Sequence, residues 1–68
     1  MNVGIIGSGG REHAICYTLR KSKKVSEIFC FPGNAGTSLI ATNVSSNPDN
    51  FSELEKYCLK KDIKILVV

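Results

Sequence analysis

Apolar residues gather in short runs along this chain of 68 residues, and the runs alternate with stretches of helical periodicity. Three runs, at 2–6, 27–31 and 64–68, have the length and composition of strands buried in a sheet. A fourth run, at 40–44, suits a short edge strand. The helical stretches predict one helix from residue 10 or 11 to about residue 22, and a second that ends near residue 60.

Each predicted helix has an apolar face that we expect to be buried. In the first helix this face consists of Ala14, Ile15, Thr18 and Leu19. In the second it consists of Phe51, Leu54, Tyr57 and Cys58. The second helix has two candidate starts. Either Asn47 is the cap and Pro48 the first helical residue, or Asn50 is the cap and Glu53 closes a pair resembling a capping box.

Strands that alternate with helices predict an α/β fold with a parallel sheet. Right-handed crossovers then place helices on both faces of the sheet. Two glycine-bearing loops, at 7–12 and 32–37, each follow a predicted strand. Since ligands of such sheets bind outside the carboxyl ends of the strands, we expect both loops to meet on the rim where ligands bind.

The first loop has the composition of an anion-binding turn. It runs Gly7-Ser8-Gly9-Gly10-Arg11-Glu12-His13-Ala14 and leads directly into a predicted helix. Glycines allow close approach of the backbone, the helix start supplies N–H groups, and Arg11 can supply a charged fork to a phosphate. A plain tight turn with Arg11 in solvent is an equally good interpretation of these residues alone.

Two common phosphate-binding motifs fit this loop poorly. The dinucleotide fingerprint G-x-G-x-x-G places its third glycine at Glu12, and the second strand ends in Phe31-Pro32 without the acid that reads ribose hydroxyls. The nucleoside-triphosphate loop needs Gly-Lys-Ser/Thr, which the chain lacks. A nicotinamide or flavin dehydrogenase is therefore disfavoured, and a phosphorylated small molecule is favoured.

The remaining polar and sulfur-bearing residues indicate structural roles. His13 has no partner placed by the sequence, which is more typical of a structural histidine than of a catalytic one. The three cysteines are widely spaced among apolar neighbours, as buried filler would be: Cys16, Cys30 and Cys58. They indicate no metal site.

Charge and composition exclude several classes of protein. The net charge is +3, and basic residues cluster at 20–24 without the interleaved aromatic residues that a nucleic-acid surface needs. This cluster is typical of a solvated helix end, so we expect no nucleic-acid partner. No apolar run approaches the roughly 20 residues of a membrane span, and no signal peptide is visible. We therefore expect no membrane association and a cytoplasmic location.

The last apolar run stops on Val67-Val68, inside an expected buried strand. Natural termini usually lie at exposed and weakly constrained sites. We therefore expect residues 1–68 to be the incomplete N-terminal domain of a longer protein, whose last strand keeps an unpaired, aggregation-prone edge.

Both loops together resemble one enzyme family. The segment Gly7 to Ala14 is similar to the opening of the phosphoribosylamine–glycine ligases, also called glycinamide ribonucleotide synthetases. Pro32-Gly33-Asn34-Ala35-Gly36-Thr37 is similar to that family's second hallmark and lies at the expected distance. The resemblance covers essentially the whole chain, although Cys16, Tyr17 and Cys30 stand where more typical apolar residues are expected.

The resemblance implies a fold and an activity. The family belongs to the ATP-grasp superfamily, so the chain would form a Rossmann-like, pre-ATP-grasp domain packed against ATP-grasp domains further along. The complete enzyme would join glycine to 5-phosphoribosylamine in purine biosynthesis, converting ATP to ADP and phosphate. ATP and Mg²⁺ (or Mn²⁺) would be held mainly by those later domains, so these 68 residues alone would be inactive.

The resemblance also implies substrate-binding residues on both loops: Gly9, Gly10, Arg11, Glu12, Asn34, Gly36 and Thr37. Backbone amides would take the phosphate with Arg11 as the cation, and Glu12 or Asn34 would read ribose hydroxyls. Two alternatives stay open. The chain could be a freestanding module that binds a phosphosugar or nucleotide, or it could belong to another ATP-grasp enzyme of purine biosynthesis.

Overall fold

The chain folds around a small parallel sheet. The structure is a computed structural model that describes residues 1–45 and 51–68. In chain order the elements are β1 (Asn2–Gly7), α1 (Gly10–Arg20), β2 (Ile28–Pro32), the 3-10 helix η1 (Thr37–Leu39), β3 (Thr42–Asn43), α2 (Phe51–Lys60) and β4 (Ile63–Val67). Both candidate starts of the second helix, at Asn47 and Asn50, lie outside the described residues.

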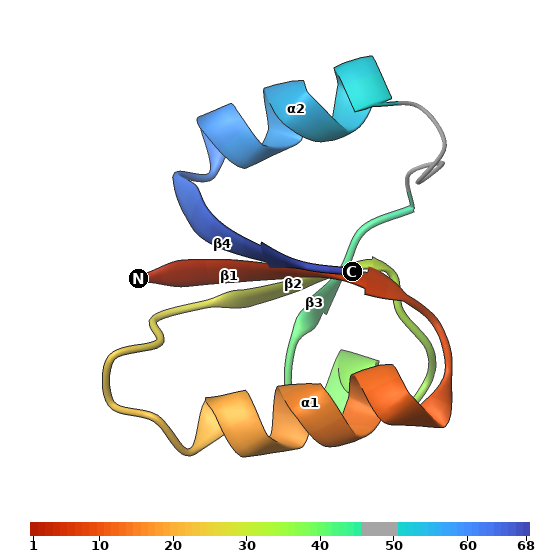
Figure 1. Cartoon of the computed structure of the whole chain (residues 1–68). Coiled ribbons are helices and arrows are strands. Elements are labelled where there is room, and N and C mark those ends of the chain that lie inside the picture. The colour runs from red at the N-terminus through yellow and green to blue at the C-terminus, as the bar shows by residue number, and fades with distance from the viewer. Residues whose placement is uncertain (46–50) are drawn as a thin grey trace.

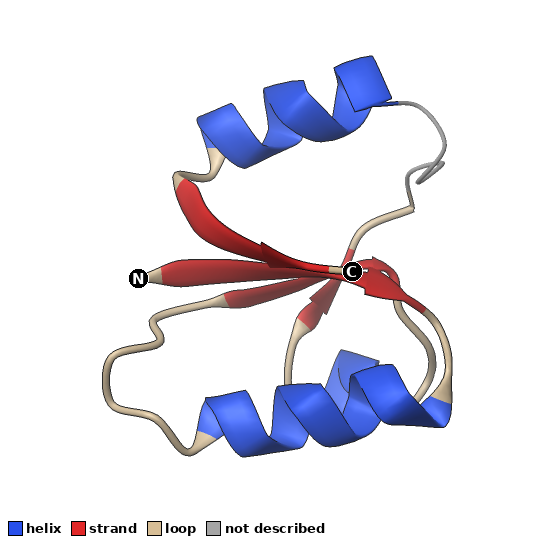
Figure 2. Cartoon of the chain, in the orientation of Figure 1, coloured by secondary structure: helices blue, strands red, loops and turns tan. Residues whose placement is uncertain are grey.

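The sheet has the order β3-β2-β1-β4, and each neighbouring pair of strands is parallel. Figure 1 shows α1 and η1 on one face of the sheet and α2 on the other. Figure 2 shows the same three layers by type of element. The predicted α/β fold with helices on both faces is confirmed. None of the helices in the described part of the chain is long and apolar enough to cross a membrane.

The two central strands sort their side chains between the two helical layers. Because successive side chains of a strand point to opposite faces, the apolar runs of β1 and β2 supply both layers. The α1 side contains Val3, Ile5, Ile28, Cys30 and, from the helix, Cys16. The α2 side contains Phe29, Phe31 and Leu54, with Tyr57 packed edge-on against both phenylalanine rings.

The buried face of each helix differs in part from the predicted one. On α1 the buried residues are Glu12 and Cys16, flanked by half-buried Ile15 and Leu19, whereas Ala14 and Thr18 are exposed. A prediction from apolar residues alone could not find this face, because one of its buried residues is the charged Glu12, which bonds to the start of the helix. On α2, Leu54, Tyr57 and Cys58 pack inward as predicted, but Phe51, in the first turn, is 75% exposed.

The outer strands are less buried than the sequence predicts. In β3 only Thr42 and Asn43 pair with β2, because Ile40 closes η1 instead. The expectation that β4 is a buried strand is wrong, since Ile65 is 47% and Leu66 is 40% exposed. The physical reason is position, because β4 lies at the edge of the sheet and pairs only with β1 in the described chain.

A substitution at Gly4 tests the packing between the sheet and α2. A Cβ atom at Gly4 would lie 2.8 Å from Leu66 Cδ1 and 3.2 Å from Phe31 Cε2, and the Phe31 ring is fully buried. We expect Gly4→Val to lower the free energy of unfolding by roughly 1–3 kcal/mol through overpacking. Denaturant titration of the chain measures this change.

Gly10→Ala is the matched control, because apart from its chain neighbours and the backbone of its own helix no atom of the described residues lies within 4 Å of a Cβ built at Gly10. Alanine also favours a helical position over glycine. The packing argument fails if both substitutions change the stability equally.

Candidate functional site

Two loops meet at the carboxyl ends of β1 and β2. The Gly33 N–H donates to the Gly7 carbonyl at 3.0 Å. The Asn34 side-chain amide donates to the carbonyls of Ser8 at 2.8 Å and Gly9 at 3.2 Å. The predicted meeting of the two loops on one rim is confirmed, and Asn34 joins them directly.

Glu12 holds the first loop from inside the first turn of α1. Its Oε2 accepts a hydrogen bond from the Gly9 N–H at 2.9 Å, while its Oε1 forms an ion pair with Arg11 at 3.1 Å. This is the backward half of a capping box, and Gly9 has no side chain to supply the forward half. The carboxylate therefore has a structural role that sequence reasoning did not assign.

Gly7 has to be glycine for two separate reasons. Its φ is +141°, in the region that side chains rarely adopt. A Cβ atom there would also meet the Glu12 carboxylate, with Oε1 only 2.7 Å away. The turn and the carboxylate that folds over it therefore require each other.

The second loop is held by a partly buried hydrogen-bond network. The Thr37 hydroxyl accepts from the Asn34 N–H at 2.8 Å and donates to Asn43 Oδ1 at 2.7 Å. Asn34 Oδ1 accepts from the Thr37 N–H at 2.9 Å, and the Asn43 amide donates to the Asn34 carbonyl at 2.7 Å. Thr37 is fully buried, so its side chain supports the loop from beneath.

His13 lies between the two loops. A Cβ atom at Gly36 would stand 2.7 Å from His13 Nδ1 and 3.2 Å from Asn34 Oδ1. The glycine at this position therefore allows the imidazole to lie against the second loop. The prediction of a structural histidine is consistent with this half-buried contact.

Arg11 and Gly10 form the open side of the site. The Arg11 side chain is 72% exposed, and only its Nε and one terminal nitrogen donate to Glu12. A guanidinium keeps further N–H donors in such an arrangement. The first backbone N–H groups of α1 have no intrahelical acceptors, and Gly10 is exposed with open space above it. This side of the rim can accept an anion such as a phosphate.

The charge of Glu12 is stabilised by its surroundings. A hydrogen bond from its own backbone N–H lowers the pKa of Glu12 below its ordinary value of 4.5, and Arg11 and the Gly9 N–H act in the same direction. Burial opposes them but does not prevail. The carboxylate is therefore ionised at neutral pH, so Arg11 has its partner in place.

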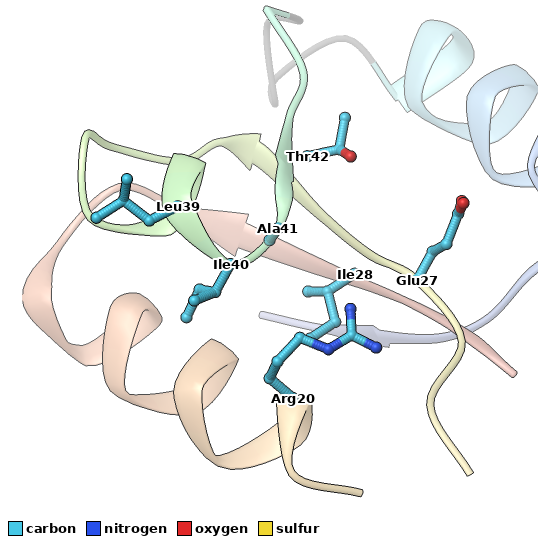
Figure 3. Close-up of a pocket in the computed structure, with 7 residues that line it drawn as sticks. All are labelled: Arg20, Glu27, Ile28, Leu39, Ile40, Ala41 and Thr42. Carbon is cyan, nitrogen blue, oxygen red and sulfur yellow. The ribbon is translucent and has the colours of Figure 1, made fainter. Parts of the chain in front are cut away.

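One cavity adjoins this rim, and a larger one lies elsewhere in the structure. A cavity of about 330 Å³ lies beside the first turns of α1 and is lined by Gly10, His13, Ala14, Tyr17 and Thr18. A larger one, about 430 Å³, lies between the end of α1, the start of β2 and the link from η1 to β3 (Figure 3). That larger cavity lies at the amino ends of β2 and β3, whereas ligands of parallel sheets bind at the carboxyl ends. The two loops, and not the larger cavity, therefore mark the candidate site.

A metal ion has no evident site among the described residues. No group of three or more His, Cys, Asp or Glu side chains lies close enough together in the described chain to hold one.

The structure brings all seven predicted site residues to one rim but gives them different surroundings. Gly10 and Arg11 face solvent, whereas Glu12, Asn34 and Thr37 already bond within the protein. Direct contact of these residues with a substrate stays a prediction. Sequence reasoning missed Asn43 as a site residue, because only the pairing of β3 with β2 places it beneath the second loop.

Comparison with known proteins points to one family. Residues 1–68 match the family model described as phosphoribosylglycinamide synthetase, N domain. The chain is 39% identical over 67 residues to a phosphoribosylamine–glycine ligase of Rhodopirellula baltica, and the match covers 98% of this chain. It is also 39% identical over 66 residues to the trifunctional purine biosynthetic protein adenosine-3 of Gallus gallus, with 94% of this chain covered.

The fold has a solved counterpart. The phosphoribosylamine–glycine ligase of Thermotoga maritima superposes with a TM-score of 0.64 at 40% identity, covering 78% of this chain and 13% of that one. The chain spans only 15% of the Rhodopirellula relative and 7% of the Gallus relative. The similarity therefore concerns one small part of much larger proteins.

The Glu12 carboxylate predicts an acid-sensitive component of stability. Because its pKa is lower in the folded chain, the stability it contributes is fully present above the unfolded-state value of 4.5 and is lost as the pH falls through the folded-state value. We expect the denaturation midpoint to fall as the pH is lowered from neutral to below 4.5. The Glu12→Gln variant should be less stable at neutral pH, and its denaturation midpoint should fall less on acidification. An unchanged acid profile in this variant would contradict the assignment.

Asn34→Asp tests the bridge between the loops. Aspartate keeps an acceptor for the Thr37 N–H but presents oxygen, not N–H, to the carbonyls of Ser8 and Gly9. We expect the free energy of unfolding to fall by about 1–3 kcal/mol. Ser38→Ala is the control, because the exposed Ser38 hydroxyl bonds only within its own loop, to the Ala35 carbonyl. Equal effects of the two variants would argue against the bridge.

Proposed function

Because the chain belongs to the phosphoribosylglycinamide synthetase N-domain family, we propose that it forms the N-terminal domain of a phosphoribosylamine–glycine ligase. The complete enzyme would join the carboxyl group of glycine to the amine of 5-phosphoribosylamine, as a step of purine biosynthesis. ATP would be converted to ADP and phosphate as it activates the glycine carboxylate. The match over the whole chain to relatives with this name supports the proposal.

The observation that carries the role of this domain is the joined pair of loops with one cationic, open side. The Arg11 guanidinium and the backbone N–H groups of Gly10 and Arg11 are available to an anion, while Glu12 and Asn34 fix the backbone that presents them. We propose that this rim binds the phosphate of phosphoribosylamine. Gly9, Gly10 and Gly36 would allow the substrate to approach the backbone closely.

Glu12, Asn34 and Thr37 enter this proposal chiefly as supporting residues. Their oxygen and nitrogen atoms already bond to the loops, so their first contribution is a rigid cradle that needs little reorganisation on binding. Recognition of ribose hydroxyls by Glu12 or Asn34 would use the remaining lone pairs of their side-chain oxygens.

ATP and a divalent cation such as Mg²⁺ are assigned to the rest of the enzyme. The cation would neutralise the phosphates of ATP during transfer. The domain would pack against those ATP-grasp domains. Exposed apolar side chains on α2 and β4 are consistent with such packing: Phe51, Leu59, Ile65 and Leu66. We place the enzyme in the cytoplasm.

Arg11→Ala in the complete ligase tests the phosphate role. A hydrogen bond to a charged group contributes about 1.5–3 kcal/mol, so we expect the KM for phosphoribosylamine to rise roughly 10- to 100-fold, with the KM for ATP unchanged. Steady-state kinetics with each substrate varied in turn measures this.

Arg20→Ala removes the same charge from the far end of α1, where Arg20 bonds to the carbonyls of Val25 and Ser26. We expect this control to keep the KM for phosphoribosylamine. If Arg11→Ala leaves that KM unchanged, the guanidinium does not bind the phosphate.

A further inference from the structure

Two thiols face each other in the middle of the core. Cys16 lies on α1 and Cys30 on β2, and their Sγ atoms are 3.2 Å apart. Both residues are 0% exposed, and they pack with Val3, Ile5 and Ile28. Neither thiol contributes to the loops, so the proposed function leaves the pair without a role.

The two sulfurs are in direct contact, at hydrogen-bond distance. A disulfide has a sulfur–sulfur length of about 2 Å, so the two atoms need to approach each other by only about 1 Å. They also belong to different elements, so a bond between them would connect the helix to the sheet. The third cysteine, half-buried Cys58, lies with the core cluster on the other face of the sheet.

We propose that Cys16 and Cys30 form a redox-modification site, in which a peroxide oxidises the two thiols to a disulfide that links α1 to β2. This inference does not rest on the proposed ligase activity. It depends only on two cysteines that the fold brings together across 14 positions of the chain.

The reaction balances with a peroxide as the oxidant. One thiol loses its proton, and its sulfur attacks a peroxide oxygen, which gives a sulfenic acid and one water molecule when hydrogen peroxide is used. The second thiol attacks the sulfenic sulfur and expels its hydroxyl group as a second water. Overall, two thiols and one hydrogen peroxide give one disulfide and two waters, with two electrons passing from sulfur to oxygen.

Burial makes this a slow reaction. Loss of contact with water raises the pKa of the Cys16 thiol to about 12, and the Cys30 thiol beside it acts in the same direction. A buried thiol of which only a small fraction is ionised to the thiolate reacts poorly with peroxide until the structure opens locally. We therefore expect the rate of disulfide formation to scale with the small fraction of molecules in which α1 has locally lifted from the sheet. Once formed, it is shielded from reducing agents.

The cross-link would act on both loops of the rim. α1 begins directly after the first loop, and β2 ends directly before the second. Cys16 also lies one helical turn after Glu12, which holds the first loop. Oxidation would therefore tie together the two elements that present the candidate site.

The test uses the complete protein, reduced, treated with hydrogen peroxide and alkylated to block free thiols. Trypsin cuts after Arg20 and the lysines at 21, 23 and 24, so Cys16 and Cys30 fall on different peptides, and it also cuts after Lys56, before Cys58. We expect a linked pair of peptides containing Cys16 and Cys30, lighter than their sum by two hydrogen atoms and separated by dithiothreitol. It should appear about tenfold or more slowly than oxidation of Cys58, which is less buried.

Two variants sharpen the result. Cys58→Ala should keep the linked pair, and Cys30→Ala should abolish it. The proposal is overturned if Cys16 and Cys30 are still free thiols after an exposure to peroxide about a thousandfold longer than oxidation of Cys58 requires, or if either is recovered as a sulfinic acid or linked elsewhere. Because the readout is a covalent bond in the unsubstituted protein, it holds whether or not the protein ligates glycine.

Discussion

The parallel pairing of β1 with β2 is the constraint on which the rest of this structure depends. Its register sets Val3 beside Ile28, Ile5 beside Cys30 and Gly7 beside Pro32. Because side chains alternate along a strand, the same register assigns every core residue of these strands to α1 or to α2. It also ends both strands at the same level, and this brings the two glycine-bearing loops to one rim.

The rim is rigid because the loops supply each other's hydrogen-bond partners. Backbone groups that the turns leave unpaired are satisfied by side chains, among them Glu12, Asn34, Thr37 and Asn43. Buried polar groups without partners cost free energy, so a network in which each member is paired specifies one arrangement of the loops. The groups that remain open, on Gly10 and Arg11, are the ones an anion would need.

The two faces of the sheet differ in what their cores contain. The α2 side is filled by large aromatic rings. Tyr57 is edge-on to Phe29 and Phe31, with ring centroids 5.7 and 5.4 Å apart respectively. The α1 side is filled by smaller aliphatic side chains and the two thiols of Cys16 and Cys30. On this side the first turn of α1 lies within reach of the second loop, where His13 lies against Gly36.

The sequence by itself determined the order and type of the main elements, the parallel sheet, and the meeting of the loops after β1 and β2. Local patterns carry this information, because strand alternation, helix periodicity and glycine punctuation act over a few residues. Only the tertiary structure decided which face of α1 is buried, how exposed β4 and Phe51 are, and what Glu12, Asn34 and Thr37 bond to. These outcomes depend on contacts between residues far apart in the chain, such as Asn43 beneath Asn34 and Cys30 beside Cys16, which no local spacing encodes.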